Sequence, residues 1–400
     1  MKVLFVIGGL EIGGAQKSTI SMLNAIDEDK YDIDLLVFNR RSLALKTEIK
    51  KNINILYIEG AGKYYFESLT NSIKHLLKEK KISLLLRRII NPFIIRIKHR
   101  TVYPEQIIWE SVKRDIVSFA GYDLAIACCQ GLPTYFVIDK VSAKKRVAWM
   151  RSDAALQIHN RDYTLKYYLE YDLVNAISTK AADSLRVKYP EILDKVSVFT
   201  NIIDANDVLY KKNLFVPSWP DDEYVKLCTV GRLCEAKGYH NAIEACKKLI
   251  DNNYKVRWYI IGEGAMRKEL EKHISELGIT ENFILLGNQN NPFPFMDKCD
   301  IYVQTSLWEG YCRTLAEAII LQKPIVTTDF AGAREQIANG KNGIVCESNA
   351  DELYMSISKL IDYPELQNLF IKELYRRETV EDGAYRFDRM VTLLFKEMEL

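Results

Sequence analysis

Short apolar runs alternate with amphipathic segments along almost the whole chain. Each run is rich in Val, Ile, Leu and Tyr, which is typical of buried strands. Between most of them, as at 240–253 and 351–362, apolar residues recur every three or four positions and indicate helices. This alternation predicts an α/β protein with parallel sheets and helices on both sheet faces. The expected strands are 2–7, 32–38, 53–58, 123–128, 145–150, 173–178, 195–200, 225–230, 256–261, 282–287, 300–305, 324–328 and 343–347.

The expected strands fall into two series separated by residues 213–224. That stretch holds two prolines and three acidic residues, so we interpret it as a linker. Two doubly wound, Rossmann-like domains facing each other across a cleft are therefore expected, with bounds at 1–205 and 206–380. The last segment, 381–400, has apolar residues at helical spacing and predicts an amphipathic helix with one face to bury.

Composition narrows the class of protein. An apolar fraction of 48% over 400 residues suffices for two full cores, and a net charge of +2 does not indicate a nucleic-acid partner. The eight cysteines form no C-x-x-C pair and sit mostly in apolar runs, as expected for reduced core residues of a cytoplasmic protein. The five histidines lie far apart in the sequence, so no zinc site is predicted. The chain begins with a strand pattern rather than a signal peptide, and no apolar run is long enough to span a membrane.

One segment departs from the alternating pattern and is interpreted as an insertion at 63–104. Residues 63–100 hold ten Lys or Arg and two Glu, mixed with branched apolar residues, and Pro92 is expected to break a helix there. A solvated helical insertion with an ordinary core face is one interpretation. We favour an amphipathic patch that lies on an anionic membrane surface, the inner leaflet, because its apolar positions are too many for a solvated face.

Glycines follow the first expected strand in the stretch VIGGLEIGGAQKST at 6–19. A P-loop needs lysine directly after its last glycine, but Ala15 and Gln16 precede Lys17, which turns the lysine roughly 200° around a helix. The glycine spacing also excludes the G-x-G-x-x-G pattern. What remains is a tight turn into a helix that opens near Ala15, with unpaired backbone N–H groups at its start.

Two cations follow the first strand of the second series, in GRLCEAKG at 231–238. Arg232 and Lys237 would lie at the carboxyl end of a parallel strand, where ligands of open α/β sheets bind. Together they could hold a diphosphate, arginine through a forked contact and lysine as a point charge. Two solvated charges on a surface loop are the alternative.

Two glutamates eight residues apart, Glu309 and Glu317, mark a more specific motif. A helix is expected to start near Cys312, with Glu309 in the preceding loop and Glu317 two turns inside. The N–H groups from Gly310 to Leu315 would point to the same place as the helix N-terminus, which favours an anion. A carboxylate on each side can accept hydrogen bonds from sugar hydroxyls, so the motif suits a nucleotide sugar. The alternative is one helix-capping acid and one unrelated surface acid.

The tract EGYCRTLAEAIILQKPIVTTD at 309–329 resembles the E-x7-E signature of retaining glycosyltransferases with the GT-B fold, in particular glycosyltransferase family 4. The resemblance covers most of the chain, is strongest over 225–346, and points to bacterial surface-polysaccharide transferases. Further matching stretches are GGLEIGGAQK at 8–17, RVAWMRSD at 146–153, NAIS at 175–178, NIID at 201–204, VGRLCEAKG at 230–238, IIGEG at 260–264 and 285–306.

This resemblance implies a role for each matching residue. Arg232 and Lys237 match the pair that clamps the donor diphosphate, Glu309 the glutamate that faces the transferred sugar, and Glu317 the one that holds the ribose. The remaining implied donor contacts are Gly310 and the backbone amides of Thr314 and Leu315, Asn288 near the base, and the loop glycines Gly13 and Gly14.

One position departs from the family. Arg151 stands where many relatives have a histidine that contacts the donor sugar. The arginine could contact a hydroxyl or an acceptor phosphate, could alter donor choice, or could mark an inactive protein. The resemblance also implies that the helix in 381–400 crosses back to the N-terminal domain.

The implied activity is transfer of a hexosyl unit, with retention, from a nucleotide diphosphate sugar, foremost a UDP-sugar, to a hydroxyl of a glycan acceptor. A polyprenyl-diphosphate-linked saccharide is the expected acceptor, and neither metal nor cofactor is expected. The triplet at 32–34 resembles a metal-binding D-x-D, but it begins a strand and so lies away from the ligand edge. Two alternatives are a nucleotide-sugar epimerase of the same fold and a catalytically inactive subunit that binds nucleotide sugar.

Overall fold

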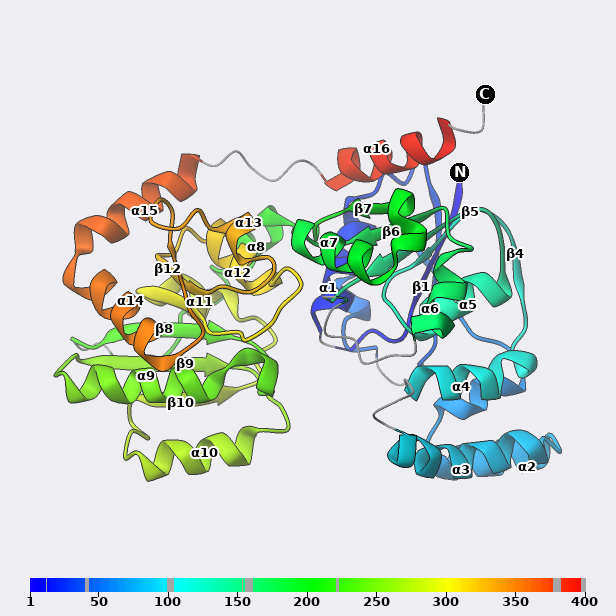
Figure 1. The fold of residues 1–400 in the computed structure, drawn as a ribbon, viewed down its shortest axis with the longest axis horizontal. Helices are drawn as coiled ribbons and strands as arrows, with labels where there is room; N and C mark the ends of the chain where they lie inside the picture. The colour runs from blue at the N-terminus through cyan, green and yellow to red at the C-terminus, as the bar shows by residue number, and fades with distance from the viewer. Residues whose placement is uncertain are drawn as a thin grey trace. The chain divides into compact units, whose positions relative to one another are not determined.

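The computed structural model describes residues 1–11, 13–39, 43–98, 104–152, 154, 161–220, 223–376 and 383–396 (Figure 1). The chain divides into two compact units. The first comprises Met1–Ile202 with Glu381–Leu400, and the second comprises Ile203–Val380. Each unit is a doubly wound α/β layer structure, as the alternating pattern predicts. All eight cysteines lie in described parts of the chain and are free thiols.

The first unit is built on a seven-stranded sheet in the order β3-β2-β1-β4-β5-β6-β7, with every neighbouring pair parallel. Its strand order reverses between β1 and β4, and Val3–Ile7 of β1 are completely buried. The strands are β1 (Lys2–Ile7), β2 (Asp32–Val37), β3 (Asn54–Tyr57), β4 (Phe119–Ala127), β5 (Val141–Met150), β6 (Leu173–Ala176) and β7 (Val196–Val198).

The second unit has a six-stranded parallel sheet in the order β10-β9-β8-β11-β12-β13, which reverses between β8 and β11. Each of the strands expected from the sequence is therefore confirmed in both units. The strands are β8 (Val225–Val230), β9 (Val256–Ile261), β10 (Phe283–Gly287), β11 (Ile301–Gln304), β12 (Ile325–Thr328) and β13 (Ile344–Cys346).

Helices connect the strands and cover the sheets because their apolar stripes need a buried face. The helices of the first unit are α1 (Gly14–Ala25), α2 (Leu69–Lys78), α3 (Ile82–Lys98), α4 (Pro104–Val112), α5 (Leu132–Lys140), α6 (Arg161–Tyr168), α7 (Thr179–Lys188) and α16 (Gly383–Lys396). Those of the second are α8 (Ala205–Lys211), α9 (Tyr239–Asp251), α10 (Arg267–Glu276), α11 (Phe293–Lys298), α12 (Arg313–Ile320), α13 (Ala333–Gln336), α14 (Ala350–Asp362) and α15 (Pro364–Arg376). Short 3-10 turns include η2 (Ala61–Phe66) and η6 (Glu235–Lys237).

The last helix, α16, belongs to the first unit although it follows the second in sequence. Phe387 is fully buried, stacked 6.0 Å from Phe5 of β1 and edge-on at 5.2 Å from Tyr31 (ring centroids). Arg386 donates hydrogen bonds to the carbonyl and hydroxyl of Thr200 at 2.9 and 2.8 Å. The expected return of this helix to the N-terminal domain is confirmed.

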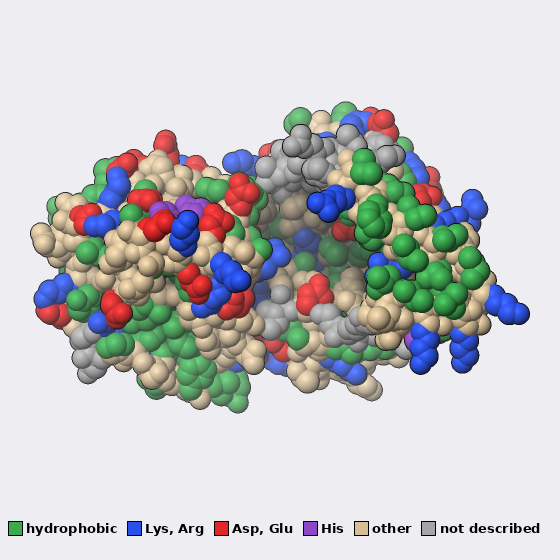
Figure 2. Space-filling view, turned by 90° about the horizontal axis from the view of Figure 1, so that it is seen from below, with side chains coloured by type: hydrophobic (Ala, Val, Ile, Leu, Met, Phe, Trp, Pro, Cys, Tyr) green, Lys and Arg blue, Asp and Glu red, His purple; other side chains and the backbone are tan. Residues whose placement is uncertain are grey.

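The basic insertion forms η2, α2 and α3, and its residues 99–103 lie outside the described part. The prediction that Pro92 breaks the helix is wrong, because α3 runs through it. Pro92 removes one backbone hydrogen bond, but packing on its inner side holds the helix: Asn91 is buried and donates to Tyr65 Oη at 2.6 Å and Ser111 Oγ at 2.8 Å. Apolar side chains gather on the outer face of the α2–α3 region, with basic ones around them (Figure 2).

Candidate functional site

The candidate site of the second unit lies at the carboxyl edge of its sheet, where the strand order reverses. The loops after β8 and β11 start from neighbouring strands at this point, which is where open α/β sheets leave a crevice for ligands. The β8 loop carries Arg232 and Lys237, and the β11 loop carries Glu309. The tertiary structure thus brings together charges that lie more than seventy positions apart in sequence.

Lys237 and Glu309 are in direct contact, with the ammonium donating to carboxylate Oε1. Both side chains are largely shielded, at 14% and 21% exposed, and Ser306 Oγ lies 3.4 Å from the same carboxylate oxygen. Burial by itself would lower the pKa of Lys237, but the neighbouring Glu309 carboxylate outweighs it and the net direction is upward. Lys237 is therefore a fixed positive charge at neutral pH, held at the sheet edge by a carboxylate.

Two glycines with positive φ let the surrounding loops pack closely. Gly238, at φ +64, follows Lys237, and a Cβ there would come within 2.2 Å of the Thr305 carbonyl oxygen. Gly262 follows β9 and has φ +149. It lies so close to the Gly231 carbonyl that a Cβ would be 2.0 Å from the carbonyl oxygen. Glycine alone tolerates both the backbone angles and the contacts. The IIGEG stretch therefore clamps the β8 loop, while the exposed Arg232 remains at the surface of that loop.

The helix α12 begins at Arg313, with Cys312 as its N-cap residue, as the sequence predicts. Cys312 adopts φ +63 and ψ 84, a left-handed conformation that costs a non-glycine residue roughly 1–2 kcal/mol. Such strain concentrates at functional sites because the surrounding structure must hold it. Burial, followed by the nearby Glu309 carboxylate, raises the pKa of the Cys312 thiol to about 12, so this thiol is protonated at neutral pH.

Glu317 lies one turn inside α12, not the two turns expected, because the helix starts only four residues before it. Its side chain is 4% exposed and accepts a hydrogen bond of 2.7 Å from Arg313 Nε. An (i, i+4) ion pair of this burial fixes the carboxylate with one oxygen engaged. The structure therefore holds Glu317 through Arg313, a partner that the sequence motif alone did not single out.

A buried polar network beneath the N-terminus of α12 was also missed from the sequence. Gln304 is fully buried at the end of β11. It accepts hydrogen bonds from Tyr302 Oη at 2.8 Å and Thr314 Oγ1 at 3.1 Å, and donates to Ser306 Oγ at 2.8 Å. Thr328 Oγ1 donates to the Ser306 carbonyl at 2.6 Å. This network joins β11, β12 and α12. A glutamine at the end of a buried apolar strand, followed by Thr305 and Ser306, was the signal that could have revealed it.

The other predicted contacts of this unit occupy the same sheet edge. Asn288 is exposed directly after β10, and Thr314 and Leu315 are the second and third residues of α12. Gly310 lies in the β11 loop beside Gly332, and the buried Gln336 donates to the Tyr311 carbonyl. These loops are thus fixed from the β12 side as well.

The predicted contacts of the first unit lie at the carboxyl edge of its own sheet. Gly14 starts α1 with nothing within 4 Å of its Cβ position, while a Cβ on Gly13 would meet only the Gln16 side chain. Arg151 follows β5, and its guanidinium donates to the Cys128 carbonyl at 2.9 Å and to Asn201 Oδ1 at 2.6 Å. Asp34, from the D-x-D triplet, is buried near the start of β2 and accepts from Tyr122 Oη at 2.7 Å, as expected for a structural acid.

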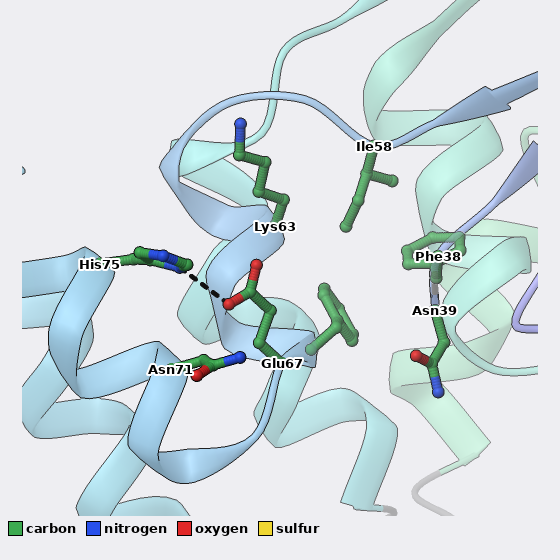
Figure 3. A pocket seen from close by; sticks show the side chains of 8 residues that line it. Phe38, Asn39, Ile58, Lys63, Glu67, Asn71 and His75 are labelled. Atoms are coloured by element: carbon green, nitrogen blue, oxygen red, sulfur yellow. Dashed lines mark hydrogen bonds and ion pairs between the residues drawn. The ribbon is translucent and has the colours of Figure 1, made fainter. Parts of the chain in front are cut away.

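A cavity of about 200 Å³ opens at the carboxyl ends of β2 and β3, next to η2 and α2 (Figure 3). One side is apolar and the other polar, where His75 Nδ1 and Glu67 Oε2 lie 2.9 Å apart. Its lining residues are Phe38, Asn39, Ile58, Lys63, Phe66, Glu67, Asn71 and His75. An aromatic wall facing amide and carboxylate groups can accommodate a sugar ring, with its apolar face on one side and its hydroxyls on the other.

Residues 211–377 match the family described as Glycosyl transferases group 1. An uncharacterized glycosyltransferase of Methanocaldococcus jannaschii is 26% identical over 311 residues, which is 73% of this chain and 71% of that protein. The HepE protein of Anabaena, solved in complex with UDP and glucose, superposes with a TM-score of 0.68 at 17% identity over 98% of this chain and all of that one. The chain has the GT-B glycosyltransferase fold.

Another relative is the N-acetylgalactosamine-N,N'-diacetylbacillosaminyl-diphospho-undecaprenol 4-alpha-N-acetylgalactosaminyltransferase of Campylobacter jejuni. It is 30% identical over 146 residues, which is 36% of this chain and 39% of that protein. Further relatives carry names from capsule and lipopolysaccharide biosynthesis. The family match and these relatives together support a glycosyltransferase, and the residues that match the family model include Lys237, Glu309 and Glu317.

Proposed function

We propose that this protein transfers a hexosyl unit, with retention and without a metal ion, from a UDP-sugar to a hydroxyl of a glycan acceptor in bacterial surface-polysaccharide synthesis. The observation that carries the proposal is the contact between Lys237 and Glu309 at the strand-order reversal of the second sheet. This pair would place a fixed cation for the leaving diphosphate beside a carboxylate for the transferred sugar.

The chemistry follows from this geometry. As the bond between the anomeric carbon and the diphosphate oxygen breaks, negative charge grows on the diphosphate. Lys237, Arg232 of the same loop and the N-terminus of α12 would stabilise that charge without reorganisation. Glu309 would hold a hydroxyl of the sugar, and Glu317, oriented by Arg313, would hold the ribose.

We attribute retention of the anomeric configuration to attack by the acceptor on the same face of the sugar from which the diphosphate leaves. The acceptor oxygen bonds to the anomeric carbon while its proton passes to a departing phosphate oxygen, so atoms and charge balance. The Cys312 thiol, protonated at neutral pH, is not suited to act as a covalent nucleophile. The protein contributes positioning and electrostatic stabilisation.

Within the first unit, three features are assigned to ligand contacts. The open backbone at Gly14 admits a close approach by donor or acceptor. Arg151, whose guanidinium is oriented by the Cys128 carbonyl and Asn201 Oδ1, is assigned to a hydroxyl or phosphate oxygen of the ligand. We assign the cavity beside Phe38 and Glu67 to the acceptor saccharide, since its two-sided lining suits a pyranose.

The acceptor is proposed to be a saccharide on a polyprenyl diphosphate, by similarity to the relative whose name specifies a diphospho-undecaprenol substrate. Such an acceptor is anchored in lipid, so the proposal locates the protein at the cytoplasmic face of the membrane.

The decisive experiment measures nucleotide release from a panel of UDP-, GDP-, ADP- and dTDP-sugars, with and without a lipid-linked acceptor. We expect one UDP-sugar to be consumed only when the acceptor is present, and the product to keep the donor's anomeric configuration by NMR. Donor consumption without acceptor would indicate an epimerase or hydrolase. Thermal stabilisation by UDP alone, about 2.7 kcal/mol at a hundred times its dissociation constant, without turnover would indicate an inactive subunit.

A further inference from the structure

The outer face of α3 presents a continuous apolar stripe. Its exposed members recur every three or four residues, so on a helix of about 100° per residue they fall within an arc of about 100°. The exposed fraction reaches 67% at Phe93 and 80% at Ile97. One further exposed residue, Leu77, comes from the end of α2. We call the set of Leu77, Ile82, Leu86, Ile89, Ile90, Phe93 and Ile97 the α3 face.

The α3 face cannot turn inward, because the opposite side of the helix is anchored. Leu84 and Leu85 are buried in the core of the first unit. Arg88 lies over the Tyr65 ring at 5.0 Å and donates to the Glu67 carbonyl, and Arg87 donates to the Ser111 carbonyl at 3.2 Å. The exposed apolar residues are therefore a property of the folded state.

Basic side chains surround this stripe. Lys74, Lys78, Lys80, Lys81 and Arg96 are all exposed on or between α2 and α3, and Figure 2 shows cationic groups at the margin of the apolar cluster. Among them Lys81 pairs with Asp115 at 2.9 Å, while Glu79 and Glu67 are the acidic residues of the insertion. Cations outnumber acids around the face, so it is complementary to a negatively charged surface.

The composition of the α3 face favours lipid over a protein partner. Protein interfaces are enriched in aromatic residues and depleted in lysine. Here the apolar residues are aliphatic apart from Phe93, and four of the five exposed cations are lysines. Within the described residues, no helix is long and apolar enough to cross a membrane. An amphipathic helix with these properties lies in the interfacial plane of a bilayer.

We propose that the α3 face docks on an anionic bilayer, with its aliphatic side chains among the acyl chains and its lysines at the head groups. This deepens the proposed function by naming the surface that meets the membrane. It stands on residues outside the transfer site, and lipid binding can be measured without donor or acceptor. Its failure is therefore distinguishable from failure of the transfer assignment.

The test is co-sedimentation with two kinds of vesicle, phosphatidylcholine alone and phosphatidylcholine with about a third phosphatidylglycerol. We expect the wild-type chain to bind the anionic vesicles at least about tenfold more strongly than the neutral ones, and to be released by salt. The variant Phe93→Gln/Ile97→Gln should lose about tenfold or more of the anionic binding, because both exposed side chains would no longer insert. Far-UV circular dichroism of the free variant should be unchanged.

The matched control is Val187→Gln/Val216→Gln, which removes two equally exposed aliphatic side chains, 84% and 76% exposed, from other surfaces. It should bind vesicles like the wild type. Equal loss in both variants, equal binding to neutral and anionic vesicles, or absence of vesicle binding would overturn the proposal. A wild-type dimer that Phe93→Gln/Ile97→Gln dissociates, seen by light scattering, would instead assign the α3 face to contact between copies of the chain.

Discussion

Replacing each partner of the Lys237–Glu309 pair separately distinguishes a diphosphate ligand from a structural salt bridge. Without donor, the ammonium is held by the carboxylate. If Lys237 binds the diphosphate, Glu309→Gln should leave the UDP dissociation constant unchanged or lower it, because the competing charge is gone. Lys237→Met should weaken UDP binding by about 10- to 150-fold, the range expected for a lost charged hydrogen bond.

The burial of the pair sets the expected effect on stability. Both side chains are mostly shielded from water, so Lys237→Met leaves the Glu309 carboxylate without its cation in a poorly solvated place. Removing one partner of a buried pair costs about 3–5 kcal/mol, and the partial exposure here places the loss near the lower end, about 3 kcal/mol. The double variant Lys237→Met/Glu309→Gln should recover most of that stability, since neither charge remains.

Isothermal titration with UDP measures the affinities, and urea unfolding measures the stabilities. Turnover of Lys237→Met should fall about 10²- to 10³-fold, by analogy with the loss of one oxyanion donor. Lys247→Met is the control, because Lys247 forms a surface pair with Asp251 on α9. If Glu309→Gln instead weakens UDP binding as much as Lys237→Met does, Lys237 does not bind the diphosphate and serves only to position the loop.

Three further predictions concern positions around the sites. Gly262→Ala should destabilise the protein by about 1–3 kcal/mol in urea unfolding, because its Cβ would strike the Gly231 carbonyl at 2.0 Å; an unchanged midpoint would contradict the proposed clamp. Gly14→Ala should leave stability unchanged within about 1 kcal/mol but lower donor turnover, and full activity would argue against a close ligand approach. Pro92→Ala should raise the thermal midpoint, since a helix interior disfavours proline by up to about 3 kcal/mol relative to alanine; a lower midpoint would mean that the ring packs favourably.

The hydrophobic periodicity was sufficient to predict the fold, because a buried parallel strand is a short run of apolar residues that can be recognised in the local sequence. The runs at 2–7 and 225–230 became β1 and β8 without shift. Pro92 shows where local rules fail: the helix penalty was real, but Asn91 and Leu84 bury enough of the inner side to offset it. The sequence pointed at most to a polar residue in the strand at 300–305, and the partners of Gln304 were not predicted because they come from separate elements.

Local sequence specifies the alternation of strands and helices, the glycine turns and the spacing of the two glutamates. These are local features, set by backbone conformation and by a period of two or 3.6 residues. Three contacts or exposures depend instead on the folded chain: Lys237 contacts Glu309, Arg313 holds Glu317, and one face of α3 stays in solvent. Such pairings depend on which loops leave neighbouring strands, and strand order is fixed by packing of the whole sheet rather than by any single segment.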